Sequence, residues 1–353
     1  MIIKIKFLNK TISIINNMQI NKKIILPVNG IAAAKQYVPL IKEISHSIPN
    51  QKIIITGSKF HSDILLKELS FNNIKTNISY KEKTSNNSEN NITIKLSYNN
   101  HSIINNENKK ELTFHIDPLK FEERRLLNEE EILKLKESYK IREKEKIIFA
   151  GAIHYHELSN VLPAVKNHLY KNKKSKAVIV PYTEGYLDDI ARYIDFETNH
   201  SLKGNKNCIV IEEQGILDKL YSIADVVLMG NTFGENSYDG QNPLEPAFYG
   251  KRILTGTDYH LWNKDAYYGL LESGLLRKIN IYDLEKELER KVSEKEIRKM
   301  QEKAESFIKS KQGAAKAYAS IVKKIAYNRI SPSEKEYLSY KRSIDELKEF
   351  LNI

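Results

Sequence analysis

The stretch DGQNPLEPAFYG at residues 239–250 holds residue types and spacings that suit the binding of an anion. Asn242 is a favoured N-cap residue, Pro243 suits the first helical position, and Glu245 falls at N3, where its carboxylate can complete a capping box. A short helix is therefore expected to begin here, with unpaired N–H groups and the positive end of its dipole at its start. Gly240 lets the backbone approach another group closely. Two interpretations stay open: an anion site, or a well-capped crossover helix with nothing bound.

The sequence contains no pattern that indicates a metal site or a disulfide bond. The single cysteine, Cys208, lies in the apolar run NCIVIEE, which is typical of a buried core thiol, and one cysteine permits no internal disulfide. The sequence HYH places His154 and His156 near each other, but the other histidines are scattered and no carboxylate–histidine cluster has the spacing of metal ligands. We expect neither a metal ion nor a cofactor, and a reducing compartment.

The elements that must position the 239–250 stretch follow from a regular alternation that begins at Lys146. Apolar runs (KIIFAG, KAVIVPY, NCIVIEE, ADVVLMG, KRILTG and RKINIY) alternate with helical patterns, which predicts a parallel sheet covered by helices on both faces. Ligands of such sheets bind at the carboxyl ends of the strands. Five polar loops fall at those ends, at residues 151–157, 181–186, 212–215, 230–242 and 255–262.

The first part of the chain has a weaker pattern. Residues 22–57 are typical of a strand, a helix and a strand, and a further helical pattern follows. The alternating runs ITIKLSY and ELTFHID favour short strands, and the Asn- and Ser-rich stretches within residues 81–110 favour long polar turns. Charged helical residues at 119–145 indicate a domain boundary. The sequence as a whole predicts two α/β domains with helices closing the C-terminus.

The positive net charge of the chain indicates which kinds of molecule it can bind. The net charge is +11 with a pI near 9.2, but lysine and glutamate alternate within helices such as EKELERKVSEKEIRKMQEK, as on a solvated, paired face. No nucleic-acid-binding motif is present, so nucleic acid is not expected as a partner. An anionic membrane surface is expected as a partner, because each Lys or Arg near such a surface adds about 1 kcal/mol to the binding free energy. With no signal peptide and no run of 18 apolar residues, we expect a cytoplasmic protein, peripheral on the inner membrane, without a transmembrane anchor.

The five loops, in order, resemble the C-terminal half of the bacterial 3-deoxy-D-manno-octulosonic acid (Kdo) transferases. The resemblance rests on GAIHYHE, VPYTEG, EEQGILDKLYSIADVVLMGN, DGQNPLEPAFYGKRILTG and TDYHLW, and covers about residues 145–325. It implies a GT-B glycosyltransferase of two Rossmann-like domains with parallel sheets, which moves Kdo from CMP-Kdo to a lipid A precursor in lipopolysaccharide biosynthesis. It also implies a shortened acceptor-side domain at 1–140, a nucleotide-sugar domain at 141–325, and a C-terminal helix at 326–353 that packs across the domains and returns to the first.

The resemblance also implies which residues bind the nucleotide. The family residues kept in this chain are His154, Gly240, Asn242 and Glu245. Gln241 replaces a histidine, so it can donate a hydrogen bond but cannot become cationic. Tyr182 and Thr183 stand where the family has arginine and histidine, so the cation that pairs bidentately with phosphate is missing. The alternatives are a structural loop role for His154 and a capping role for Glu245.

The catalytic base is the largest departure from the family. The segment LPVNGIAAAKQYVPLIKEI resembles the family's first strand and helix, and the position of the catalytic glutamate falls on Ala33. Alanine cannot take the proton of an acceptor hydroxyl, so we expect Kdo transfer to be absent or slowed by about two to four orders of magnitude. Glu235 and Asp117 are the candidates for a replacement carboxylate.

Three functions stay open on this evidence from the residues. The leading prediction is a Kdo-transferase-like enzyme that uses CMP-Kdo or a similar sugar nucleotide and a lipid-linked acceptor. The second is a catalytically inactive nucleotide-binding paralogue with an interaction role. The third is a GT-B enzyme that uses another sugar nucleotide.

Overall fold

The protein forms two compact units, Met1–Arg124 with Gln312–Ile353, and Arg125–Lys311. We call them unit 1 and unit 2. The boundaries expected from the sequence, after residues 140 and 325, stay predictions. The structure is a computed structural model, and the residues that it describes are 23–28, 31–48, 52–72, 74, 78–80, 91–95, 101–107, 110–116, 119–213, 215–234, 240–256, 263–326, 329, 333–334 and 344–352.

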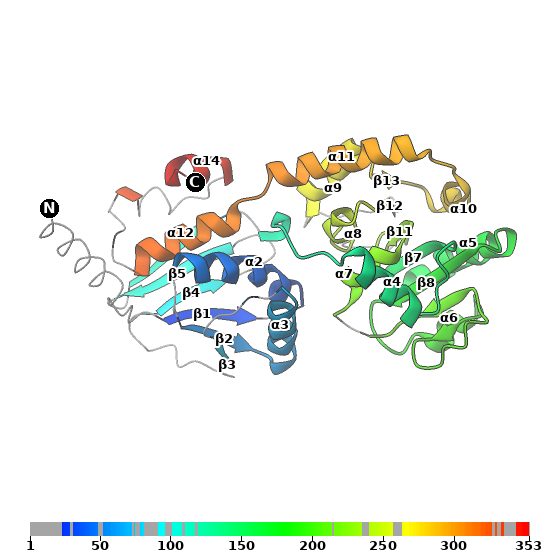
Figure 1. Ribbon diagram of the computed structural model, residues 1–353, viewed down its shortest axis with the longest axis horizontal. Coiled ribbons are helices and arrows are strands. Elements are labelled where there is room, and N and C mark those ends of the chain that lie inside the picture. Colours follow the sequence, from blue (N-terminus) through cyan, green and yellow to red (C-terminus); the bar gives the residue numbers. More distant parts are fainter. Residues whose placement is uncertain are drawn as a thin grey trace, which may run out of the picture. The chain divides into compact units, whose positions relative to one another are not determined.

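Unit 1 is built on a six-stranded sheet with the order β3-β2-β1-β4-β5-β6 (Figure 1). Its strands are β1 (Lys23–Val28), β2 (Ile53–Gly57), β3 (Ile78–Tyr80), β4 (Asn91–Lys95), β5 (His101–Glu107) and β6 (Lys110–Ile116). The pairs among β3, β2, β1 and β4 are parallel, whereas β5 pairs antiparallel with both β4 and β6.

The antiparallel half of this sheet differs from the parallel sheets that we expected. The connections from β4 to β5 and from β5 to β6 span residues 96–100 and 108–109, which are too few for the crossover that a parallel pair requires. Strand β5 lies in a stretch assigned to turns in the sequence analysis, because its asparagines have low strand propensity. Pairing with two neighbours overrides that local preference.

The core of unit 1 joins segments from opposite ends of the chain. Helix α2 (Ile31–Ser47) buries Tyr37 and Ile41, and α12 (Ala314–Ala326) buries Tyr318 and Ile321, all in one cluster with β1 and β2. The helical spacing of these apolar residues gives each helix one buried face. The two helices lie side by side (Figure 1). Unit 1 also contains α3 (Lys59–Phe71), the short helix η1 (Leu119–Phe121) and α14 (Ile344–Leu351).

Glu122 binds the beginning of the C-terminal segment of unit 1 through hydrogen bonds. Its Oε1 accepts hydrogen bonds from the N–H groups of Gly313, at 2.8 Å, and Ala315, at 3.2 Å, at the beginning of α12. A carboxylate at this position complements the helix dipole and satisfies N–H groups that have no partner within the helix. Burial nevertheless raises the pKa of Glu122, and the backbone hydrogen bonds partly offset that effect.

Unit 2 is built on a seven-stranded sheet with the order β13-β12-β11-β7-β8-β10-β9, in which every pair is parallel. Its strands are β7 (Lys146–Ile153), β8 (Ser175–Pro181), β9 (Glu197–Thr198), β10 (Cys208–Val210), β11 (Val226–Met229), β12 (Arg252–Thr255) and β13 (Leu276–Lys278). All six strands expected from the apolar runs are present. Strand β9 was not expected, because its two residues are too few to form a recognisable pattern.

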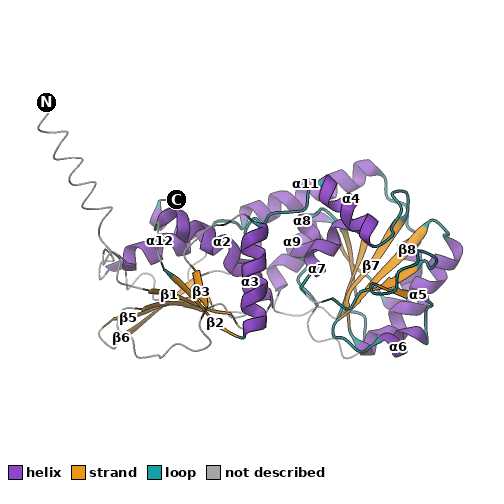
Figure 2. Ribbon diagram, turned by 60° about the horizontal axis from the view of Figure 1, so that its bottom comes forward, coloured by secondary structure: helices purple, strands orange, loops and turns teal. Residues whose placement is uncertain are grey.

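Helices cover both faces of the unit 2 sheet (Figure 2). One group, α5, α6 and α10, packs together and contributes to a large apolar core with alternate strand residues, and a second group comprises α8, α9 and α11. The helices are α4 (Glu129–Ser138), α5 (Leu158–Lys171), α6 (Leu187–Ala191), α7 (Leu217–Leu220), α8 (Leu244–Phe248), α9 (Lys264–Ser273), α10 (Leu284–Glu289) and α11 (Glu294–Ser310), with short helices η2 (Tyr155–Glu157), η3 (Tyr221–Ile223) and η5 (Ile281–Asp283).

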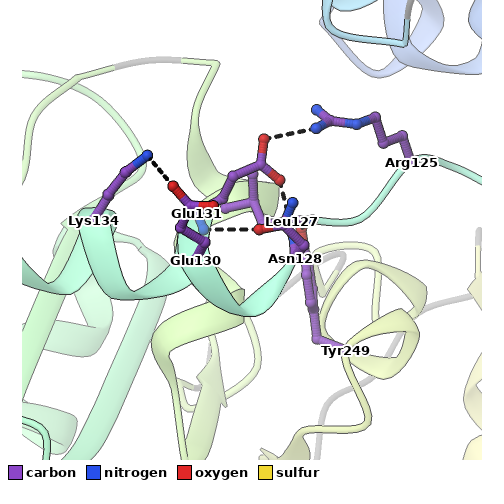
Figure 3. A network of polar contacts seen from close by, with 7 residues as sticks. All are labelled: Arg125, Leu127, Asn128, Glu130, Glu131, Lys134 and Tyr249. Atoms are coloured by element: carbon purple, nitrogen blue, oxygen red, sulfur yellow. Dashed lines mark hydrogen bonds and ion pairs between the residues drawn. The ribbon is translucent and has the colours of Figure 1, made fainter.

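Unit 2 begins with a well-capped helix, α4 (Figure 3). Asn128 accepts a hydrogen bond from the Glu131 N–H, and Glu131 accepts one from the Asn128 N–H, each at 2.9 Å, which completes a capping box. Arg125 pairs with the same carboxylate at 2.6 Å, and the Leu127 N–H donates to the Tyr249 hydroxyl. These contacts fix where the chain enters unit 2.

In the part of the chain that the structure describes, no helix is long and apolar enough to cross a bilayer.

Candidate functional site

The strand order of unit 2 marks where a ligand is expected to bind. After β7 the chain passes to β8 on one side, and it later returns to place β11 on the other side of β7. The carboxyl ends of β7 and β11 therefore flank a topological switch point, where open α/β sheets bind ligands. The loops that follow these two strands, 154–157 and 230–243, contain most of the residues that the sequence singled out.

A buried carboxylate joins these two loops. Glu157, at the end of η2, is fully buried. Its oxygens accept hydrogen bonds from the backbone N–H groups of His154 at 2.9 Å and Asn231 at 2.6 Å. They also accept from the N–H groups of Thr232 and Phe233, both at 2.8 Å. Four donors compensate the cost of burying one carboxylate, and they fix the course of both loops.

Glu157 is not among the residues expected from the sequence to form the site. A glutamate in a polar loop is usually exposed, so its type gave no signal. The signal that was available is its place three residues after His154, at the end of GAIHYHE, where it can reach back to a backbone N–H.

Close backbone contacts further constrain the loop after β11. A Cβ atom on Gly230 would lie 1.9 Å from the Ala152 carbonyl oxygen, and one on Gly256 would lie 1.7 Å from that of Thr232. The Thr232 hydroxyl donates to the Met229 carbonyl at 2.6 Å and accepts from the Gly256 N–H at 2.9 Å. The ends of β11 and β12 are thus joined through one side chain, which leaves the loop little freedom.

His154 and Tyr182 lie together at the edge of this arrangement. Their rings stack, with centroids 4.0 Å apart and planes 20° apart, and the His156 ring lies 5.6 Å from that of His154. Burial, with a smaller contribution from His156, lowers the pKa of His154 to about 4. The imidazole of His154 is therefore neutral at physiological pH. Tyr182 is half-exposed and presents its free face to solvent.

Both histidines of this group carry a buried polar atom with an unmet hydrogen bond. Among the described residues, neither the Nε2 of His154 nor that of His156 has a hydrogen-bond partner. Such atoms are uncommon in folded proteins and mark places where a ligand group or a water completes the arrangement. This observation favours the ligand-contact interpretation of His154 over a structural loop role.

The segment DGQNPLEPAFYG forms the expected short helix, α8, but the helix begins one residue later than expected, at Leu244, with Pro243 as N-cap and without a side-chain cap from that residue. Just before it, the Asn242 side chain accepts a hydrogen bond from the Leu244 N–H at 3.2 Å, and the Glu245 N–H donates to the Asn242 carbonyl at 3.4 Å. The Gln241 N–H donates to the Gly230 carbonyl at 3.4 Å, so this segment is joined to the loop held by Glu157. Because two N–H groups of its first turn already have partners, α8 fits the capped-helix interpretation better than a strong anion site.

An open, acidic cavity of about 560 Å³ lies beside the β8 loop. Its lining residues are Glu184, Gly185, Leu187, Asp188 and Glu212. The Gly185 N–H donates to Glu212 at 3.0 Å, which holds one of these carboxylates in place. The residues expected to replace the family's cation, Tyr182 and Thr183, directly precede this acidic group, so the local charge is opposite to that of a phosphate site.

The candidates for the catalytic base are not placed with these residues. Ala33 lies in the first turn of α2, in unit 1. Asp117 and Glu235 lie outside the described residues. Within the described ranges, no three His, Cys, Asp or Glu side chains are grouped so as to hold a metal ion.

Comparisons with known proteins give two sequence relatives. No protein-family model matches the chain. A stretch of 96 residues, 27% of the chain, is 36% identical to a bifunctional glycosyltransferase/methyltransferase of Fusobacterium nucleatum, of which it covers 14%. A stretch of 126 residues, 35% of the chain, is 29% identical to the 3-deoxy-D-manno-octulosonic acid transferase of Aquifex aeolicus, of which it also covers 35%. The chain thus matches about a third or less of each relative's length, and the resemblance expected from the loops is confirmed for that part.

The fold is similar to that of a solved glycosyltransferase and of a putative UDP-N-acetylglucosamine 2-epimerase from Listeria monocytogenes, the latter with a TM-score of 0.50 at 12% identity over 88% of this chain and 98% of that one. The crystal structure of a glycosyltransferase from Rickettsia africae superposes with a TM-score of 0.52 at 14% identity, and the match covers 87% of this chain and all of that one. The expected α/β class with a GT-B type of fold is confirmed, and the parallel sheet expected for each unit is complete in unit 2, whereas the sheet of unit 1 is mixed.

Proposed function

We propose that this chain is a glycosyltransferase of the Kdo-transferase type that binds a sugar nucleotide at the carboxyl edge of the unit 2 sheet. The observation that carries the proposal is the Glu157 carboxylate, which fixes the two loops at the topological switch point. The sequence similarity to a Kdo transferase supports the same assignment. CMP-Kdo or a close analogue is the proposed donor.

The nucleotide is proposed to lie against His154 and Tyr182. A neutral imidazole with an unpartnered Nε2 can form a hydrogen bond with a base or ribose, and the exposed face of Tyr182 can stack with a base. The backbone of Gly240, Gln241 and Asn242 is proposed to line one side of the nucleotide. The hydrogen bond from the Gln241 N–H to the Gly230 carbonyl holds this backbone to the loop after β11. Without an arginine the phosphate is bound weakly, so we expect millimolar affinity for the free nucleotide.

For the acceptor, we propose a lipid-linked sugar presented at the cytoplasmic face of the inner membrane. The support for an anionic membrane surface is the net charge of +11. The protein is proposed to be peripheral there. Transfer requires a base for the acceptor hydroxyl, and alanine at position 33 does not supply one.

The decisive experiment measures CMP release from CMP-Kdo with a lipid A precursor in anionic vesicles. We expect release by the wild type to be absent or slowed by about two to four orders of magnitude relative to a complete enzyme, and to rise in Ala33→Glu. Glu235→Gln tests the replacement carboxylate. Fast wild-type turnover that Glu235→Gln leaves unchanged would show that the account of the base is wrong. If cytidine, uridine and adenine nucleotides all fail to bind at about millimolar concentration, the nucleotide site itself is refuted.

One observation favours a second candidate, a GT-B enzyme that uses another sugar nucleotide. An octulosonic acid carries a carboxylate, and Glu184, Asp188 and Glu212 would repel it if the sugar entered the acidic cavity. The same carboxylates accept hydrogen bonds from the hydroxyls of a neutral sugar. Stronger binding of a nucleotide carrying a neutral sugar than of CMP-Kdo would decide for this candidate. Nucleotide binding without transfer from any donor would instead indicate the inactive paralogue.

A further inference from the structure

A second cavity lies at the opposite edge of the unit 2 sheet, where the strands begin. It has a volume of about 720 Å³. Lys146, Ser175, Val226 and Arg252, the first residues of β7, β8, β11 and β12, all line it. The other lining residues are His168, Lys171, Asn172, Asp225, Leu288, Glu289, Arg290, Lys291, Val292 and Ile297. We call it the amino-edge pocket, and no residue discussed for the nucleotide site belongs to it.

The walls of the amino-edge pocket carry an excess of positive charge. The cations are Lys146, Lys171, Arg252, Arg290 and Lys291, and the carboxylates are Asp225 and Glu289. A cavity of this size is within the range of small-molecule sites, which is roughly 300 to 1,000 Å³. Its charge and its size together fit an anion larger than a simple inorganic ion.

The two carboxylates already have partners. Asp225 accepts a hydrogen bond from the Ile147 N–H at 2.6 Å. Glu289 lies 3.4 Å from the Lys171 ammonium, which is held more closely by Glu285 at 2.5 Å. Asp225 thus binds the backbone of β7 and also attracts Lys146, and Glu289 attracts Lys171. The five cations of the pocket still outnumber its two carboxylates.

Arg252 is a half-buried cation of the pocket. Among the described residues, its guanidinium makes no hydrogen bond or ion pair, whereas the nearby Glu287 pairs with Arg277 at 3.0 Å and lies 3.9 Å from Arg290. Lys146 donates to the Leu288 carbonyl oxygen at 3.2 Å, a neutral partner. A half-buried guanidinium with unused donors is well suited to bind two oxygens of one anion.

The electrostatics agree with this geometry. Burial lowers the pKa of Arg252, and the charge of Arg290 lowers it further. Burial also lowers the pKa of Lys146, with a contribution from Arg252, and that of His168, with a contribution from Lys146. Glu287 and Asp225 act in the opposite direction on Arg252 and Lys146, but burial is the largest effect for both groups. A bound anion would offset this cost of holding Arg252 and Lys146 charged.

We propose that the amino-edge pocket binds a phosphate-bearing anion, held by the guanidinium of Arg252 together with Lys146 and Arg290. The ligand is either a soluble phosphate ester or the headgroup of a phosphorylated lipid, which present the same chemistry. The site is separate from the proposed nucleotide site, since it lies at the opposite ends of the same strands. It goes beyond the proposed function, and it does not depend on it.

The test is a titration of the full chain with glycerol 3-phosphate, followed by calorimetry. We expect saturable binding that Arg252→Gln weakens by about tenfold or more, because a bidentate charged contact is lost. Lys203→Gln, a change of equal charge at an exposed residue outside the pocket, should leave the affinity unchanged. Asn242→Ala, at the other edge of the sheet, should also leave it unchanged, so binding at the nucleotide site is distinguished. Thermal melts check that each variant is folded, and Arg290→Gln replaces Arg252→Gln if that variant fails to fold.

A second arm separates the two sources of phosphate. Vesicles of phosphatidylcholine with phosphatidic acid are compared with vesicles of phosphatidylcholine alone. Binding to the first kind that glycerol 3-phosphate competes with and that Arg252→Gln abolishes identifies a lipid headgroup, and binding in solution alone identifies a soluble ester. The proposal is overturned if the wild type binds neither probe, if Arg252→Gln and Arg290→Gln bind like the wild type, or if Asn242→Ala alone removes binding.

Discussion

His154 is held in its uncharged form, because burial lowers its pKa to about 4 from an ordinary value of 6.5. Between these two values the unfolded chain takes up a proton that the folded chain does not. The free energy of unfolding therefore falls as the pH drops through this window, and the contribution of His154 is fully present above it.

Replacing His154 by glutamine should remove this part of the pH dependence. We expect the melting temperature of the variant to fall less than that of the wild type between about pH 7 and pH 5. The difference between the two slopes is the readout, so any loss of the stacking contact with Tyr182 does not confuse it. His200→Gln, at an exposed histidine, is the control. Equal slopes in wild type and His154→Gln would contradict the assigned pKa.

Glu157 permits a sharper prediction on stability. Glu157→Gln keeps the shape of the side chain but turns one acceptor into an NH₂ group that faces backbone N–H donors. With four hydrogen bonds to a buried carboxylate affected, we expect a loss of about 3 kcal/mol in the free energy of unfolding, and weaker nucleotide binding. Urea denaturation measures the first, and Glu184→Gln, an exposed carboxylate, is the control. A loss no larger than that of the control would show that the carboxylate does not hold the loops.

The sequence identified His154 and Tyr182 separately, but it did not show that they touch. In the sheet, Ile153 of β7 pairs with Pro181 of β8, and the Tyr182 N–H donates to the Ile153 carbonyl at 2.9 Å. The next residue of each strand is therefore set beside the other. Strand register is fixed by packing of the whole sheet rather than by local pattern, which is why sequence alone could not place these side chains together.

At the scale of elements, the prediction succeeded where strands are buried on both sides. The strands of unit 2 read as continuous apolar runs, which is the pattern of a covered parallel sheet. The prediction failed for β5 of unit 1, whose adjacent residues Asn105 and Asn106 have little strand propensity. The existence of a helix after Asn242 was expected correctly, but the helix begins at Leu244 with Pro243 as N-cap, one residue later than the capping pattern predicted.

The contact between the ends of β11 and β12 leads to a prediction at this scale. Gly256→Ala places a Cβ atom 1.7 Å from the Thr232 carbonyl oxygen, so one of the two strands must shift. We expect a loss of about 3 kcal/mol or more in the free energy of unfolding, by overpacking against a rigid backbone. Gly185→Ala, at a φ of +94° in an open loop with nothing near its Cβ, should cost about 1 kcal/mol. If urea denaturation shows equal losses, the close approach is not a constraint.

At the scale of the whole molecule, unit 1 is discontinuous in sequence and unit 2 is continuous. Tyr318 and Ile321 of α12 are buried in the same core as Tyr37 of α2, so residues 1–124 lack part of their own core. We predict that a fragment of residues 125–311 unfolds cooperatively on its own, whereas a fragment of residues 1–124 does not. Circular dichroism during thermal denaturation is the measurement. A cooperative transition in the 1–124 fragment would contradict the assignment of α12 to that core.

The hydrogen bonds from Gly313 and Ala315 to Glu122 have a consequence for the order of events on the ribosome. The helix and strands made first cannot close their core until α12 emerges, and residues 125–311 must be synthesised in between. At bacterial and eukaryotic translation rates that interval is about 10 to 40 s. During this interval, the apolar side chains of α2 and β1 that α12 later covers are exposed to solvent and to other protein chains. The unit whose synthesis begins first is therefore the last to complete its core.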